Sequence, residues 1–119
     1  MSQIYKLRIE RWHPSTLNKL MRGKIHARIK MEAIDKNMVA GYVYQNRIPR
    51  AQSRRRVDLH LTLAPRNKEA DVDAYWKITL DALKSCGMLV DDHRQYCQLG
   101  EVTFERGAER ATLITLTDL

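Results

Sequence analysis

Hydrophobic and polar residues alternate most strictly over residues 57–63, where valine and leucine are separated by Asp58, His60 and Thr62. A period of two is the pattern of a strand with one buried face. Residues 4–12 alternate in the same way, with Tyr5, Leu7 and Ile9 predicted to point inward. Both segments are therefore predicted to be strands of one sheet.

Two further segments have the three- and four-residue spacing of helices. The first covers residues 24–45, and its predicted core positions are Ala27, Met31, Ile34, Met38 and Tyr42. The second begins at Asp71 or Val72 and ends at Cys86, and its predicted core positions are Val72, Tyr75, Ile78, Thr79, Ala82, Leu83 and Cys86. Gly87 stands where a left-handed residue ends a helix, and Ser15 or Thr16 is predicted to cap a short additional helix.

The C-terminal part predicts a hairpin, with strands over residues 99–105 and 111–117 and a turn around 107–108. Strands and helices interleave without a regular strand–helix–strand rhythm, which favours an α+β fold. Neither a repeat nor a linker divides the chain, so one domain over residues 1–119 is predicted. No apolar run is long enough for a membrane span, and the first residues alternate without a signal region, so a cytoplasmic protein is expected.

The net charge of +7 is unevenly distributed along the chain. Residues 1–56 carry 14 basic and 3 acidic side chains, whereas residues 57–119 carry 7 and 11. A basic half favours a polyanionic partner, because neutralising phosphates releases counterions. The alternative is a solvated basic face without a partner. The candidate phosphate contacts are Asn18, Lys19, Arg22, Lys24, Arg28, Arg47, Arg50, Arg54, Arg55 and Arg56.

The acidic half contains a second pattern, with Asp71 and Asp73 at a helix start and Asp91-Asp92 beyond the helix end. Magnesium prefers oxygen ligands, typically one or two carboxylates with water and substrate phosphate. With a lysine and a basic surface nearby, such carboxylates suit metal-assisted phosphodiester hydrolysis. The structural alternatives are helix capping by one aspartate and an Asp73–Lys77–Asp81 ladder of surface ion pairs.

The stretch from Asp71 through Asp73, Lys77 and Asp81-Ala82-Leu83 to Gly87 and Asp91-Asp92 resembles the RusA-like Holliday-junction resolvases, a family often carried by phages and prophages. The segment Pro14-Ser15-Thr16-Leu17-Asn18-Lys19 resembles the family's Pro-Ser-x-Asn region more weakly. The total length also matches. One departure is Ala74, where the family usually has asparagine directly after the second aspartate.

The resemblance implies a RusA-like mixed sheet packed with helices, in an intertwined or twofold homodimer. It implies a crossover junction endodeoxyribonuclease that binds four-way DNA and nicks opposing strands with Mg²⁺, or Mn²⁺ in its place, in recombination and repair. Asp71, Asp73 and Asp92 then align with the catalytic metal ligands, Asp91 with the preceding aspartate, and Lys77 with the essential lysine. No organic cofactor or membrane partner is implied.

Two other functions stay open on the sequence. A non-catalytic protein of the same fold that binds branched DNA would explain Ala74 as decay. A nuclease for flaps is the third reading. Trp12 and Trp76 are candidates for stacking on bases, although core packing is favoured for both, and Cys86 and Cys97 are expected to be free thiols.

Overall fold

Residues 57–63, predicted as a strand, lie in β2 (Arg55–Leu63), an inner strand of the sheet that pairs with a neighbour on each side. The computed structural model describes residues 3–15 and 25–119. The remaining elements, in chain order, are β1 (Ile4–Glu10), α2 (Ile25–Gln45), the 3₁₀ helix η1 (Val72–Tyr75), α3 (Trp76–Ser85), β3 (Cys97–Arg106) and β4 (Ala111–Asp118). The predicted α+β class is confirmed for this part of the chain.

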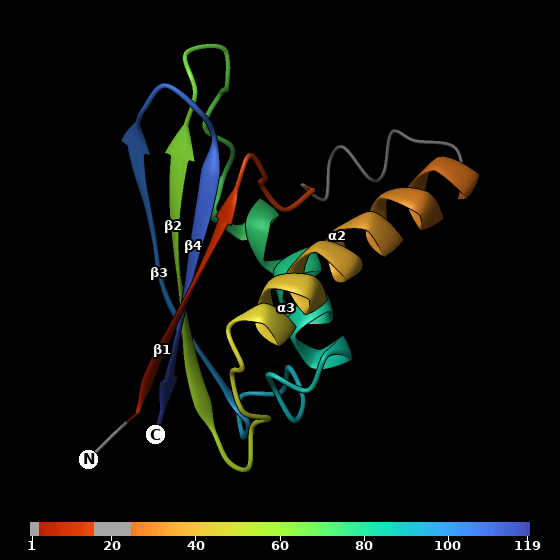
Figure 1. Ribbon diagram of the computed structural model, residues 1–119, viewed down its shortest axis with the longest axis vertical. Coiled ribbons are helices and arrows are strands. Elements are labelled where there is room, and N and C mark those ends of the chain that lie inside the picture. Colours follow the sequence, from red (N-terminus) through yellow and green to blue (C-terminus); the bar gives the residue numbers. More distant parts are fainter. Residues whose placement is uncertain (1–2, 16–24) are drawn as a thin grey trace.

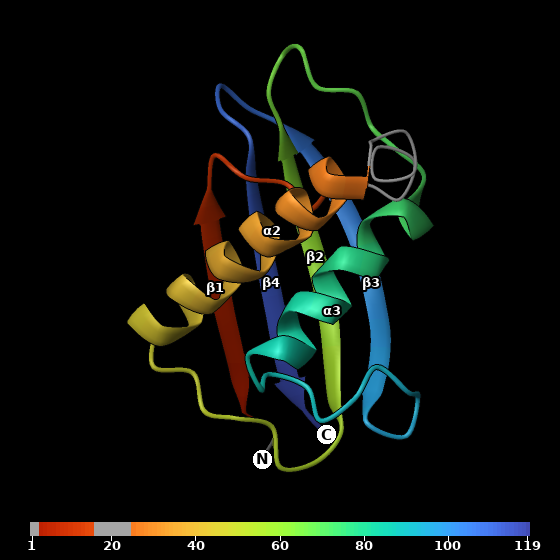
Figure 2. The ribbon, with the colours of Figure 1, turned by 90° about the vertical axis from the view of Figure 1, so that its right-hand side faces the viewer.

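The strands form one mixed sheet in the order β1-β4-β2-β3, with β2 and β3 parallel and the other pairs antiparallel. Both α2 and α3 cover the same face of the sheet, and none of the described residues forms a helix on the opposite face (Figures 1 and 2). Inward-facing residues such as Leu7, Leu59 and Ile114 are fully buried under these helices. The domain is therefore a two-layer structure with its core between sheet and helices.

The predicted C-terminal hairpin is wrong in its pairing, although both of its strands exist. β2 lies between β3 and β4, so these two consecutive strands do not bond to each other. The connection over residues 107–110 steps across the end of β2, where the Gly107 N–H donates to Leu63 O at 3.0 Å. Four residues reach about 13 Å, enough to cross two strand spacings of about 4.8 Å.

The predicted core face of α2 is right only in part, because Met38 and Tyr42 are half-buried against the core but other predicted positions are not. Ala27 and Ile34 are exposed, and the buried positions are Asp35, Val39 and Val43. Asp35 tolerates burial because its carboxylate accepts hydrogen bonds from Trp12 Nε1 at 2.8 Å and from the Ser15 N–H at 3.3 Å. A buried acid whose carboxylate is fully hydrogen-bonded cannot be predicted from the spacing of apolar residues.

The remaining predictions concern single side chains and the helices. Trp12 and Trp76 are core residues, which excludes stacking on bases by either ring. Cys86 and Cys97 are free thiols, as predicted. Val72, predicted as core, is exposed. The short helix expected after Ser15 lies outside the described residues. None of the helices in the described ranges is long and apolar enough to cross a membrane.

Gly87 ends α3 with φ of +80°, as its position in the sequence predicts. The Met88 N–H donates to Leu83 O at 2.8 Å and the Gly87 N–H to Lys84 O at 3.2 Å, which satisfies the last carbonyls of the helix. A Cβ at this position would lie 2.6 Å from Arg50 Nη1. Glycine is therefore required here both for its backbone angle and for space.

We expect Gly87→Ala to lower the free energy of unfolding by about 1–2 kcal/mol, the cost of a left-handed residue with a side chain. The matched control is Gly41→Ala in α2, where a Cβ meets nothing within 4 Å. That change should stabilise by about 0.5–1 kcal/mol, because alanine is the better helix former. Urea unfolding of the three proteins measures both effects, and equal midpoints for the two variants would contradict the assignment.

Candidate metal and nucleic-acid site

The acidic motif begins on η1, directly before α3. Tyr75 fixes this segment: its buried ring packs against Phe104 with centroids 5.8 Å apart, and its hydroxyl accepts the Ala70 N–H at 2.9 Å. Asp71 and Asp73, on the outer side of the same segment, are exposed. Asp71 stands at the N-cap of η1, but its side chain makes no capping hydrogen bond. Helix capping therefore does not account for this aspartate.

Lys77 lies in the first turn of α3, and 60% of its side chain is exposed. Its Nζ is 3.1 Å from Asp81 Oδ2, so one step of the expected Asp73–Lys77–Asp81 ladder forms. The other step, between Asp73 and Lys77, is not among the ion pairs of the described residues. The hydrogen bond to Asp81 raises the pKa of Lys77, and the charges of Asp92 and Glu32 raise it further. Lys77 thus stays cationic within electrostatic range of Asp92.

Asp91 and Asp92 lie in the loop between α3 and β3. The Asp92 N–H donates to Asp91 Oδ1 at 2.7 Å, and Lys84 Nζ is 3.5 Å from the same oxygen. This backbone N–H, followed by the Asp92 side chain and Lys84, lowers the pKa of Asp91. Asp91 is therefore held within its own loop, while the Asp92 carboxylate has no cationic partner among the described residues.

A survey of all eight aspartates separates two groups. Five have partners within the fold: Asp35 binds Trp12, Asp58 binds Arg56, Asp81 binds Lys77, Asp91 binds Lys84, and Asp118 binds Arg55. The other three carboxylates form no ion pair among the described residues, and the side-chain contact of one of them, Asp92, is with the neighbouring acid Asp91. These three are Asp71, Asp73 and Asp92, the residues that the family resemblance implies as metal ligands.

The convergence of these carboxylates is not seen. Within residues 3–15 and 25–119, no group of three or more His, Cys, Asp or Glu side chains is arranged to hold a metal ion. α3 begins after Asp73 and ends before Asp91, and a ten-residue helix is about 15 Å long. Carboxylates also repel one another when no cation lies between them. The chain brings Asp92 toward Lys77, but not all three aspartates together.

Arg55, a predicted phosphate contact, lies inside the protein with 2% of its side chain exposed. Its guanidinium donates to Asp118 Oδ1 at 2.6 Å, Met88 O at 3.1 Å and Pro49 O at 3.0 Å. It also lies 5.1 Å from the centre of the Tyr5 ring. Because its guanidinium is buried and held by these partners, Arg55 is not accessible to DNA, and we remove it from the proposed binding surface.

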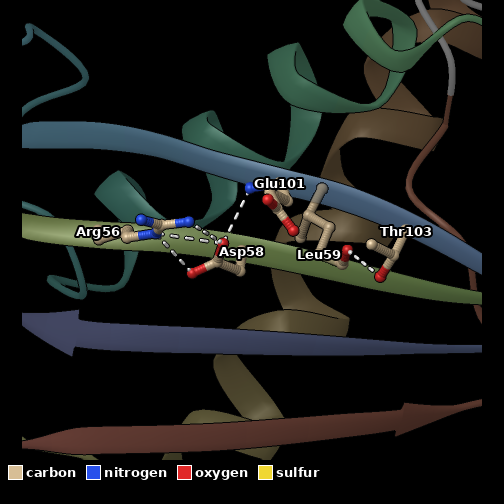
Figure 3. A network of polar contacts seen from close by, with 5 residues as sticks. All are labelled: Arg56, Asp58, Leu59, Glu101 and Thr103. Carbon is tan, nitrogen blue, oxygen red and sulfur yellow. Dashed lines mark hydrogen bonds and ion pairs between the residues drawn. The ribbon is translucent and has the colours of Figure 1, made fainter.

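Arg56, on the open face of the sheet, is also engaged (Figure 3). Its guanidinium donates to both oxygens of Asp58 at 3.1–3.2 Å, and Asp58 also accepts the Glu101 N–H at 2.8 Å. This carboxylate fills the β2–β3 irregularity between Val57 and Leu59, where a side chain at Gly100 would collide with it. The guanidinium of Arg56 is therefore occupied by a contact within the sheet. Arg54 is exposed, and its Nε donates to Arg94 O at 2.9 Å.

Of the other predicted phosphate contacts, Arg28 lies on α2 and is partly exposed, and Arg47 and Arg50 are exposed just after α2. Asn18, Lys19, Arg22 and Lys24 lie outside the described residues, so the structure does not test them.

A pocket beside the acidic motif is not predicted by the sequence patterns. It has a volume of about 280 Å³, and its wall includes His13, Ser15, Lys68, Ala70 and Arg110. These residues come from three separate parts of the chain, and the basic ones have no motif spacing. A signal was present, however, in the two cations Arg66 and Lys68 of the polar loop that leads to Asp71.

Comparison with known proteins gives no assignment: no family model matches the chain, and no curated protein matches it significantly.

Proposed function

We propose that this protein is a magnesium-dependent endonuclease that acts on four-way DNA junctions. The observation that carries the proposal is the division of the aspartates. Five bind partners inside the fold, whereas Asp71, Asp73 and Asp92 have exposed carboxylates without a cationic partner among the described residues. Unneutralised carboxylates flanking one helix suit a hard divalent cation, and their spacing is that of the resolvase resemblance.

In this proposal Asp71, Asp73 and Asp92 hold Mg²⁺, with Asp91 beside them. The bound ion would lower the pKa of a water molecule and neutralise charge at the scissile phosphate. Lys77 would stabilise the developing oxyanion, and the support for this role is that its ammonium is exposed in the first turn of α3. Its ion pair with Asp81 orients it without consuming its other two N–H donors.

Paired nicking also motivates the proposed homodimer. A four-way junction has approximate twofold symmetry, and one chain carries one acidic motif. A twofold dimer is the economical way to present two such sites to opposing strands.

The direct test is incubation of excess protein with a synthetic four-way junction in Mg²⁺, with a flap and a linear duplex of the same sequences as controls. Paired nicks confined to the junction support the proposal. Preferential flap cleavage would instead favour the flap nuclease.

One observation favours the second candidate, a non-catalytic protein that binds branched DNA. The three aspartates do not converge among the described residues, and Ala74 replaces the family's asparagine. Junction binding without nicks at protein excess, in Mg²⁺ and in Mn²⁺, would establish this candidate and overturn the catalytic one.

A further inference from the structure

The pocket beside the acidic motif has a fixed wall. The His13 imidazole donates from Nε2 to Thr62 O at 2.7 Å, and burial lowers its pKa, so it is a neutral and oriented part of the wall. The residue before it, Trp12, accepts the Thr112 hydroxyl at its carbonyl oxygen at 2.7 Å, which ties this segment to β4. The pocket therefore belongs to the end of the sheet and is not a gap between loose side chains.

Two cations line this pocket, and both are positioned by backbone contacts. Arg110 Nε donates to Arg11 O at 2.9 Å, and the Arg11 N–H donates back to Arg110 O at 2.9 Å. Lys68 stands in a loop closed by Asn67, whose side chain accepts the Ala64 N–H at 2.9 Å. Arg106 fastens the same loop through hydrogen bonds to Ala64 O at 3.2 Å and Asn67 O at 2.7 Å.

The charge of the pocket is one-sided. Its lining within the described residues includes no aspartate or glutamate, and neither Lys68 nor Arg110 forms an ion pair in the part of the chain that the structure describes. The Arg110 charge is close enough to contribute to lowering the His13 pKa. Two unneutralised cations beside a polar pocket attract an anion.

The position of the pocket indicates which anion. Ala70, in its wall, directly precedes Asp71, so the pocket opens one residue from the first proposed metal ligand. We propose that this pocket binds a phosphate of the DNA strand adjacent to the scissile phosphate, with Lys68 and Arg110 as its contacts. The inference rests on the proposed function and adds the group that holds the strand in register at the acidic motif.

The test is the salt dependence of junction binding without divalent metal, measured by fluorescence anisotropy for the unmodified protein and for Lys68→Gln/Arg110→Gln. Loss of two phosphate contacts should reduce the slope of log K against log salt by about 1.8 and weaken binding roughly 10–100-fold at 0.1 M salt. The loss should be the same for junctions of different sequence, because phosphate contacts do not distinguish bases. Lys68→Gln alone, which disturbs no hydrogen bond of the described fold, should reduce the slope by about 0.9.

The matched control is Lys6→Gln/Lys30→Gln, which removes the same charge from exposed positions on β1 and α2. Its slope should stay near that of the unmodified protein. Normal binding and nicking with an unchanged slope in the Lys68 and Arg110 variants overturns the pocket and leaves the nuclease standing. A reduced slope without nicking in Mg²⁺ supports the pocket and overturns the nuclease. Absence of junction binding by the unmodified protein overturns both.

Discussion

Asp73→Asn is expected to lower the rate of junction nicking by about a thousandfold while leaving junction binding intact or tighter. Asparagine keeps the size of the side chain but removes the negative charge that would hold Mg²⁺. Metal-assisted stabilisation of several kcal/mol would be lost, and each 1.36 kcal/mol is a factor of ten in rate. Binding does not suffer, because one negative charge near the DNA phosphates is removed. Single-turnover nicking in Mg²⁺ and anisotropy without metal measure the two quantities separately.

Asp81→Asn is the matched control, because Asp81 lies on the same helix and pairs with Lys77 but is not a proposed ligand. We expect its nicking rate to stay within about tenfold of the unmodified protein, because an exposed ion pair contributes little. Normal nicking by Asp73→Asn would remove Asp73 from the metal site. Equal losses in both variants would show that Lys77 positioning, and not metal binding, is the sensitive quantity.

The local structure of this chain could be predicted where one face of an element is uniformly apolar. β1 and β2 alternate cleanly, and Gly87 marks the end of α3 by its conformational freedom. The pairing of β3 and β4 could not be predicted, because alternation shows which face of a strand is buried but not which strand lies beside it. The buried face of α2 differs from the predicted one because Asp35 occupies a core position. Its carboxylate is satisfied by hydrogen bonds from Trp12 and Ser15, which are 20–23 residues away in the sequence.

At the candidate site, too, the residues could be predicted from the sequence but their arrangement in space could not. The spacing of Asp71, Asp73 and Asp92 along the sequence was enough to name them as candidate ligands, and all three side chains are exposed. Their convergence depends on the path of the loop between α3 and β3, and on any cation that offsets their repulsion, which no local pattern encodes. The run of arginines shows that identical neighbours in the sequence can have different environments. Arg54 is exposed, Arg55 is buried against Asp118, and Arg56 forms an ion pair with Asp58 on the sheet.

Burial of Arg55 leads to the largest expected effect on stability. Asp118→Ala should lower the free energy of unfolding by about 3 kcal/mol, because it leaves a buried guanidinium without its charge partner. The carboxylate itself is about one-third exposed, which favours the lower end of the usual range for a broken buried pair. Urea unfolding of the variant measures the loss, and it is a large part of the 5–15 kcal/mol that stabilises a typical domain.

The double variant Arg55→Met/Asp118→Ala separates a lost ion pair from lost packing. Methionine fills the space of the arginine stem without a charge, so we expect the double variant to be more stable than Asp118→Ala by at least about 1 kcal/mol. The exposed pair Arg8–Glu10, at 2.8 Å, is the control: Glu10→Ala should change stability by less than about 1 kcal/mol. Comparison with the single variant Arg55→Met completes the cycle. If the losses of the two single variants simply add in the double variant, the guanidinium and the carboxylate do not stabilise each other, and the buried arginine is held by Met88 O and Pro49 O alone.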